Sequence, residues 1–170
     1  MQFPAGAEGD DVIKSDVFGT GLEELARHGL HFEYVVHADR LPAIVEATRL
    51  HPDCKVVLNH CGLNDSGQDF DAWKANITAL AACSNAFVKL SAIEEWKPVD
   101  DDPGPYLDHA LREFGPARCM FGGNWFVPVA FGKPFKSTLD LVAAALDRMA
   151  ANDEMRDMVF AGTATSFYRL

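Results

Sequence analysis

The sequence is poor in positive charge, which limits the partners that it can bind. Its 170 residues include 15 lysines and arginines against 25 aspartates and glutamates, so the formal net charge is -10 and the isoelectric point lies near 4.9. Nucleic acids are bound by clustered basic side chains, and here the basic residues are scattered along the chain. We therefore expect no nucleic-acid partner.

The sequence also lacks a long apolar run and a cysteine pair. No stretch reaches the ~20 apolar residues that span a bilayer, and residues 1–11 carry glycine and acidic side chains where a signal peptide has basic and then apolar ones. Its four cysteines form no C-x-x-C pair, and disulfides would suit a small secreted domain better than this chain. We expect reduced thiols, a cytoplasmic location and no association with membranes.

What the sequence does contain is enough apolar material for one core. Hydrophobic residues make up 48% of the chain, which suits a single domain of this length. Residues 1–16 combine proline, glycine and an acidic patch. This composition predicts a loosely ordered amino-terminal segment over 1–16, followed by one domain over 17–170.

Four apolar runs of strand character alternate with helix-length amphipathic stretches. The runs cover Leu30–Val36, Lys55–Asn59, Ala86–Leu90 and 119–122. Continuous apolar strands separated by helices are typical of a parallel sheet with both faces covered. Four strand–helix units are half of the eight that close a barrel. We predict an α/β half-barrel or a small open sheet, with the four strands adjacent in sequence order and the helices outside.

Helix signals lie between and after these runs. Apolar spacing and capping residues predict helices over 17–28, 39–50, 69–83, 105–114, 137–150 and 153–160, with Asp39, Asp69 or Asp71, and Asn152 as caps. Within the third strand, alternation places Lys89 on the face opposite Val88 and Leu90.

Polar residues follow each apolar run at the point where the run ends. His37 follows the first run, Asn59 and His60 end the second, Ser91 follows the third, and Asn124 comes shortly after the fourth. In parallel barrels the functional residues lie at the carboxyl ends of the strands. We therefore predict that His37, His60 and Asn124 converge at one mouth, with Ser91 nearby.

Six segments, in order, resemble the amidohydrolase-related (amidohydrolase 2) TIM-barrel hydrolases of the lactonase-like branch. These segments are Phe18–Leu30 (FGTGLEELARHGL), the helix start at Leu41-Pro42, Val56–Gly62 (VVLNHCG), Val88–Ser91 (VKLS), Phe114–Trp125 (FGPARCMFGGNW) and Phe160–Leu170 (FAGTATSFYRL). The resemblance covers the chain from about Asp16 onward. It implies a metal-dependent-hydrolase-like barrel, of which this chain is similar to the carboxyl-terminal half. The family's first strand, with its paired histidines, would lie upstream of Met1.

The resemblance also implies roles for individual residues. His60 matches the sixth-strand histidine that binds metal or contacts substrate in the family, and His37 matches the equivalent place on the preceding strand. Metal-dependent members carry an aspartate where this chain has Asn124, although a branch of the family is similar in having asparagine. A carboxamide can orient a water molecule but cannot take its proton.

From these matches we expect His60 and Asn124 to be catalytic, with His37, Ser91 and Trp125 contacting substrate. His37 and His60 are candidate ligands of a divalent metal such as zinc, but zinc prefers at least three protein ligands. A metal-independent reaction therefore stays open. The alternative roles are structural: loop-capping histidines, and packing for Trp125.

The implied function is that of a hydrolase acting on a small lactone or related cyclic ester through an activated water, weak or inactive in this short form. The alternative is a non-catalytic, barrel-derived binding protein or subunit. An incomplete barrel would leave open strand edges and an open inward face, with Val35, Val57, Val88 and Met120 as examples. We therefore expect a homo-oligomer or a requirement for the missing amino-terminal half, which could be absent because the chain is a fragment.

Overall fold

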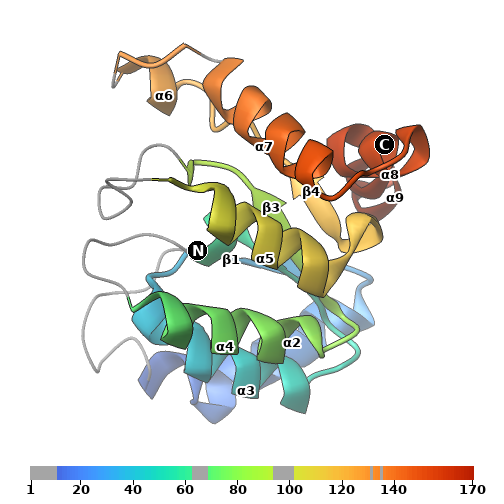
Figure 1. Cartoon of the computed structure of the whole chain (residues 1–170). Helices are drawn as coiled ribbons and strands as arrows, with labels where there is room; N and C mark the ends of the chain where they lie inside the picture. Colours follow the sequence, from blue (N-terminus) through green and yellow to red (C-terminus); the bar gives the residue numbers. More distant parts are fainter. Residues whose placement is uncertain (1–10, 63–68, 94–101, 131, 135) are drawn as a thin grey trace.

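A four-stranded parallel sheet forms the centre of the computed structural model, which describes residues 11–62, 69–93, 102–130, 132–134 and 136–170 (Figure 1). The strands are β1 (His31–Tyr34), β2 (Lys55–Leu58), β3 (Ala86–Leu90) and β4 (Cys119–Phe121), and they lie in the order β1-β2-β3-β4. Every neighbouring pair is parallel. The predicted strands and their order are therefore confirmed, with ends that differ by up to two residues.

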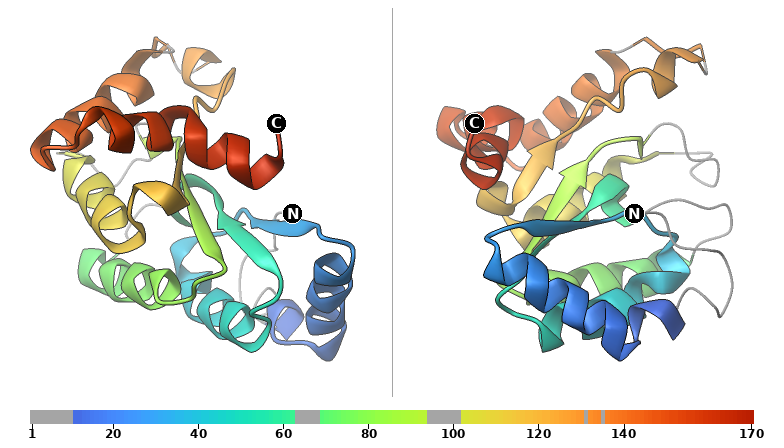
Figure 2. Two further views of the ribbon diagram at one scale, coloured as in Figure 1. Left: turned by 90° about the vertical axis from the view of Figure 1, so that its right-hand side faces the viewer. Right: turned by 180° about the vertical axis from the view of Figure 1, so that it is seen from behind.

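The helices cover the sheet in the order in which they occur along the chain. Their bounds are α2 (Asp16–Arg27), α3 (Leu41–Leu50), α4 (Phe70–Ala81), α5 (Gly104–Phe114), α6 (Val127–Ala130), α7 (Lys136–Arg148), α8 (Asp153–Asp157) and α9 (Thr163–Tyr168). Helix α3 packs against α4, α4 against α5, and α5 against α7 (Figures 1 and 2). None of the helices in the described ranges is long and apolar enough to cross a membrane.

Two of the predicted helix caps are present. The Asp69 carboxylate accepts hydrogen bonds from the backbone N–H groups of Asp71 and Ala72, and the Asn152 side chain accepts one from Met155 N–H. The cap predicted at Asp39 is wrong. Residues Ala38–Arg40 form a separate 3-10 turn, and α3 begins directly after it at Leu41, where Pro42 fits the first turn of the helix.

The helix-covered face of the sheet carries the main core. The strand register aligns Tyr34, Leu58, Val88 and Cys119 in one row across the sheet, and each of these side chains is fully buried. All four cysteines are free and buried, which confirms that they pack as small hydrophobic groups.

Part of the opposite face of the sheet is covered by α9, which corrects the prediction that Val57 and Met120 lie open, while Val35 is half-buried. Val57 and Met120 point away from α2–α5, yet both are buried, because Phe167 of α9 packs against them. Val88 points to the helix-covered face instead. Figure 2 shows the carboxyl-terminal helices, in red, lying across the strands.

Helix α9 was not predicted, and the last predicted helix ended at residue 160. A π-helical turn over Met158–Gly162 instead joins α8 directly to α9. A Cβ on Gly162 would lie 3.0 Å from the sulfur of Met158. The glycine therefore allows close packing inside a continuing helix.

Removing the Phe167 ring should destabilise the fold. The ring lies 4.7 Å from that of Phe87 and 4.8 Å from that of His31. We expect Phe167→Ala to lower the free energy of unfolding by about 3 kcal/mol, since truncating a buried aromatic leaves a cavity. The matched control is Leu170→Ala, whose side chain is 86% exposed and should change stability by less than about 0.5 kcal/mol. Urea denaturation measures both, and equal stabilities would contradict the role given to α9.

Candidate active site

The carboxyl ends of the four strands lie at one edge of the sheet, because all of the strands are parallel. Asn59 and His60 follow β2 directly, and Ser91 follows β3. The predicted polar strand ends are therefore at the same end of the fold.

His60 and Ser91 form the central contact at this edge. The imidazole Nδ1 of His60 lies 2.8 Å from Ser91 Oγ, and Ser91 is buried. Across the sheet, Gly122 follows β4 beside Ser91, where a Cβ on the glycine would come within 3.0 Å of Ser91 Cβ. The missing side chain at Gly122 lets the start of the Asn124 loop approach the His60–Ser91 pair.

The backbone that presents His60 is unusual. His60 has φ 57° and Cys61 has φ 52°, in the left-handed region that residues other than glycine seldom adopt. The indole N–H of Trp73, on α4, donates a hydrogen bond of 2.9 Å to the Cys61 carbonyl and holds this turn in place. Such local strain is typical of functional sites, where surrounding structure maintains it.

The surroundings of His60 favour its neutral form. Burial lowers the pKa of the imidazole, and the nearby Lys89 ammonium lowers it further, while the Glu33 carboxylate opposes both. A neutral imidazole keeps a nitrogen lone pair that can accept a proton at neutral pH.

A half-buried carboxylate, Glu33, lies near this site and was missed by the sequence analysis. Glu33 accepts hydrogen bonds from Lys89 Nζ at 2.8 Å, Asn59 Nδ2 at 3.0 Å and the Tyr168 hydroxyl at 2.5 Å. A signal for Glu33 is nevertheless present in the sequence. Two apolar runs each contain a single charged residue, Glu33 in HFEYV and Lys89 in FVKL. The predicted direction of Lys89 is confirmed by its bond to Glu33.

These hydrogen bonds determine the charge of Glu33. Burial alone would raise its pKa, but the bonds from Lys89, Tyr168 and Asn59 outweigh burial and hold the pKa at about 2. Glu33 is therefore ionised across the whole physiological range.

The other predicted site residues lie in the segments that follow β1 and β4. His37 follows β1 at the same edge of the sheet and is half-buried, as is Asn124 after β4. Trp125 is 67% exposed, and its role in substrate contact or in packing stays a prediction. The convergence of His37 and Asn124 on His60 stays a prediction.

The metal site expected at His37 and His60 is not complete in the described part of the chain. No three histidine, cysteine, aspartate or glutamate side chains within the described ranges are grouped so that they could hold a metal ion. The nearby Lys89 ammonium, which lowers the pKa of His60, would also repel a cation. The described residues therefore do not fit zinc by themselves.

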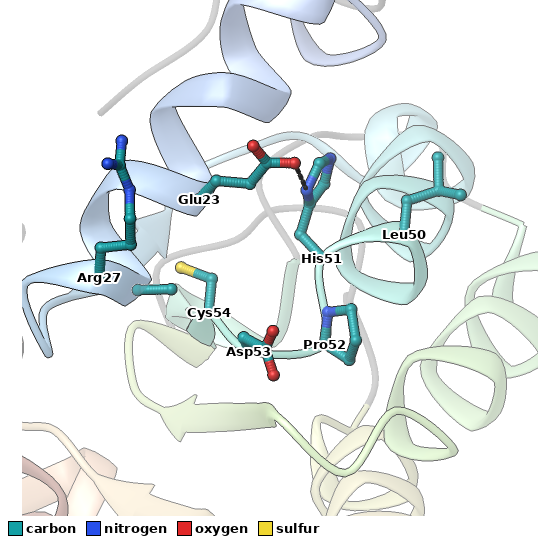
Figure 3. A pocket seen from close by; sticks show the side chains of 8 residues that line it. Glu23, Arg27, Leu50, His51, Pro52, Asp53 and Cys54 are labelled. Atoms are coloured by element: carbon teal, nitrogen blue, oxygen red, sulfur yellow. Dashed lines mark ion pairs between the residues drawn. The ribbon is translucent and has the colours of Figure 1, made fainter.

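A cavity of about 380 Å³ lies at the opposite end of β2, away from these residues (Figure 3). It opens between α2 and the loop His51–Cys54, and Glu23 Oε1 is 3.6 Å from His51 Nδ1 across it. Because this loop precedes β2, the cavity is separate from the strand-end site.

The parallel strands alternating with helices are units of a (βα)-barrel fold. The amidohydrolase family model matches residues 2–170, and the chain belongs to this family. It is 29% identical to an L-fucono-1,5-lactonase of Burkholderia ambifaria, covering 95% of this chain and 57% of that protein. It is 27% identical to an uncharacterized protein of Sinorhizobium fredii, covering 94% of this chain and 54% of that protein.

Solved structures show the same fold. An amidohydrolase from Burkholderia multivorans with bound zinc superposes with a TM-score of 0.84 at 25% identity, over 97% of this chain and 61% of that one. A putative 2-pyrone-4,6-dicarboxylic acid hydrolase from Pseudomonas putida superposes with a TM-score of 0.76 at 18% identity, over 99% of this chain and 62% of that one. The chain thus spans little more than half the length of the proteins it matches.

The charge of Glu33 predicts a pH-dependent contribution to stability. A carboxylate whose pKa is lowered on folding stabilises the fold above its unfolded pKa of 4.5, and that stabilisation is lost as the pH falls toward about 2. We expect Glu33→Gln to lower the free energy of unfolding by on the order of 2 kcal/mol at pH 7, and by clearly less at pH 3. Chemical denaturation at the two pH values checks this, and a pH-independent difference would contradict it.

Proposed function

We propose that this chain carries the carboxyl-terminal half of the active site of a hydrolase that opens a small lactone or a related cyclic ester. The observation that carries the proposal is the His60–Ser91 pair at the carboxyl edge of a parallel sheet, with His60 held neutral. The similarity to proteins named L-fucono-1,5-lactonase supports a lactone as the substrate class.

In this proposal His60 handles the proton of the attacking water. When Nδ1 carries the ring proton, its N–H donates a hydrogen bond to Ser91 Oγ. Nε2 then keeps its lone pair. Nε2 takes a proton from water as the water oxygen bonds to the lactone carbonyl carbon. The ring C–O bond then breaks, the leaving alkoxide takes the proton back from the imidazolium, and a hydroxy acid is released.

Asn124 has a supporting role in this scheme. Its carboxamide N–H groups can donate to the carbonyl oxygen, on which negative charge develops during attack. Because the carboxamide has no titratable oxygen, it cannot replace His60 as the base. His37 and Trp125 are assigned to substrate contact.

The rest of the catalytic machinery is assigned to the part of the barrel that this chain does not span. Roughly 40% of the length of the proteins it matches lies outside the matched part, and we propose that this part of the barrel supplies the remaining catalytic groups. We assign no catalytic step to a metal, because the described residues do not complete a metal site.

The experiment is a screen of five- and six-membered lactones, with the chain alone and with the separately produced amino-terminal part of the Burkholderia multivorans amidohydrolase. We expect His60→Ala to lower turnover by about 10²- to 10⁴-fold, the contribution of a general base. Ser91→Ala should lower turnover less, because it removes only the partner that orients the ring. The control is His28→Ala, since the His28 side chain is 66% exposed.

The pH profile gives a second test. Because burial and Lys89 lower the pKa of His60, the rate should fall only below the usual histidine range, as the imidazole becomes protonated. A rate that is independent of His60 would refute the proposal. No turnover under either condition would favour the alternative, a non-catalytic barrel-derived subunit.

A further inference from the structure

Lys89 places a positive charge on the face of the sheet that carries the candidate site. Lys89 lies within β3, and Ser91 follows that strand two residues later. The strand pairing continues past β3, because Gly122 N–H donates to the Leu90 carbonyl at 3.1 Å. Side chains two apart on a strand point to the same side, with their Cα atoms about 7 Å apart. The Lys89 ammonium therefore lies on the same face as the His60–Ser91 contact.

This ammonium is the strand cation that an anion near the carboxyl edge would meet. The four strands contain two lysines and no arginine. Lys55 begins β2, toward the opposite edge of the sheet, whereas Lys89 is the fourth of the five residues of β3. Because the whole chain carries a net charge of -10, a local positive charge is needed for this edge to attract an anion.

Glu33 and Tyr168 hold the Lys89 ammonium in place. Among the described residues, Lys89 Nζ donates to Glu33 Oε2 at 2.8 Å, across the intervening strand β2. The same nitrogen lies 5.4 Å from the Tyr168 ring centroid, within the range of a cation–π contact. An ammonium has three N–H donors, and the Lys89 side chain is 24% exposed. The ammonium is therefore fixed in position and within reach of a ligand.

The Glu33 carboxylate does not depend on Lys89 alone. It also accepts hydrogen bonds from Asn59 Nδ2 at 3.0 Å and from the Tyr168 hydroxyl at 2.5 Å. Both of these donors are uncharged, and hydrogen bonds to a carboxylate stabilise its ionised form. The positive charge of Lys89 can therefore act on a second anion.

We infer that the Lys89 ammonium binds the carboxylate of the hydroxy acid formed at this site and, during the reaction, the ester carbonyl oxygen that becomes part of that carboxylate. The inference rests on the proposed function, because the carbonyl is that of the proposed lactone. It adds a charged donor to the carboxamide assigned to Asn124. A donor that is already in position stabilises the negative charge that develops during attack.

Lys89 keeps its protons throughout this reaction. As the water oxygen bonds to the carbonyl carbon, the C=O π electrons move onto the carbonyl oxygen, and a Lys89 N–H donates to that oxygen. The C=O bond then re-forms, the ring C–O bond breaks, and its electron pair leaves on the alkoxide, which takes the proton held by His60. The new carboxylic acid gives its own proton to solvent and remains beside Lys89 as a carboxylate.

The test compares the binding of two probes to the whole chain by isothermal titration calorimetry. D-gluconate is a hydroxy acid with an ionised carboxylate, and D-gluconamide has the same skeleton with a neutral carboxamide. We expect gluconate to bind about tenfold or more tightly, because a hydrogen bond between two charged groups is stronger than one to a neutral acceptor. Lys89→Met should abolish this preference, and Lys89→Arg should retain it.

Glu33→Gln separates ligand binding from a purely structural ion pair. It removes the carboxylate that competes for the ammonium, so the preference for gluconate should be kept or increased. If Lys89 served the fold alone, Glu33→Gln and Lys89→Met would have the same effect on both probes. The double variant Glu33→Gln/Lys89→Met leaves neither charge unpaired, and it should fold and show no preference. The control is Lys136→Met, at a side chain on α7 that is 71% exposed, and it should bind like the unmodified chain.

Nuclear magnetic resonance of the unmodified chain gives a readout that needs no folded variant. Gluconate should shift the signal of the Lys89 Cε methylene group, and gluconamide should not. The inference would be overturned by absence of gluconate binding, by equal binding of the two probes, or by a preference that survives Lys89→Met. Because these readouts do not use catalysis, gluconate binding at Lys89 without lactone turnover would reject the proposed function alone. Turnover without a preference for gluconate would reject this inference alone.

Discussion

The Glu33 carboxylate is the interaction on which the arrangement of this molecule depends most. Its two oxygens accept hydrogen bonds from Asn59 at the end of β2, Lys89 on β3 and Tyr168 on α9. One anion on the edge strand β1 therefore fixes two other strands and the carboxyl-terminal helix. A half-buried carboxylate that lacked these donors would be protonated or exposed to water. The same cluster places a positive charge near His60, so it links the packing of the sheet to the chemistry of the strand ends.

The carboxyl-terminal helix explains how a four-stranded sheet can cover its second face. Phe167 covers Val57 and Met120, and Tyr168 reaches the polar cluster beside them. Apolar and polar contacts thus come from adjacent residues of one short helix, and each supports the other. Exposed apolar side chains also lie beside β1, at Val12 and Val17, at one edge of the sheet rather than across its face.

The sequence predicted those features that depend on local patterns. Continuous apolar runs predicted the four strands and their order, and the capping residues Asp69 and Asn152 were evident from the residues that follow them. The family resemblance, carried by six short segments, is confirmed over residues 2–170. The pairing of His60 with Ser91 agreed with their common position at the ends of neighbouring parallel strands.

What the sequence did not reveal depends on contacts between distant residues. Glu33 and Tyr168 are separated by 135 positions, and no periodicity connects them. Helix α9 was missed because its continuation from α8 depends on the close approach of Met158 to Gly162, which no local pattern reveals. The prediction of an open inward face came from the incomplete barrel, and it did not anticipate that Phe167 of α9 packs against Val57 and Met120.

The hydrogen bond from Trp73 to the Cys61 carbonyl has a consequence for how this protein can be observed. The Trp73 indole is 1% exposed and touches the turn that carries His60, whereas the Trp125 indole is 67% exposed in the loop after β4. A buried indole and a hydrated one emit at different wavelengths. Besides Trp96, the chain therefore contains two intrinsic optical probes in contrasting surroundings, Trp73 at the strained turn and Trp125 at the surface.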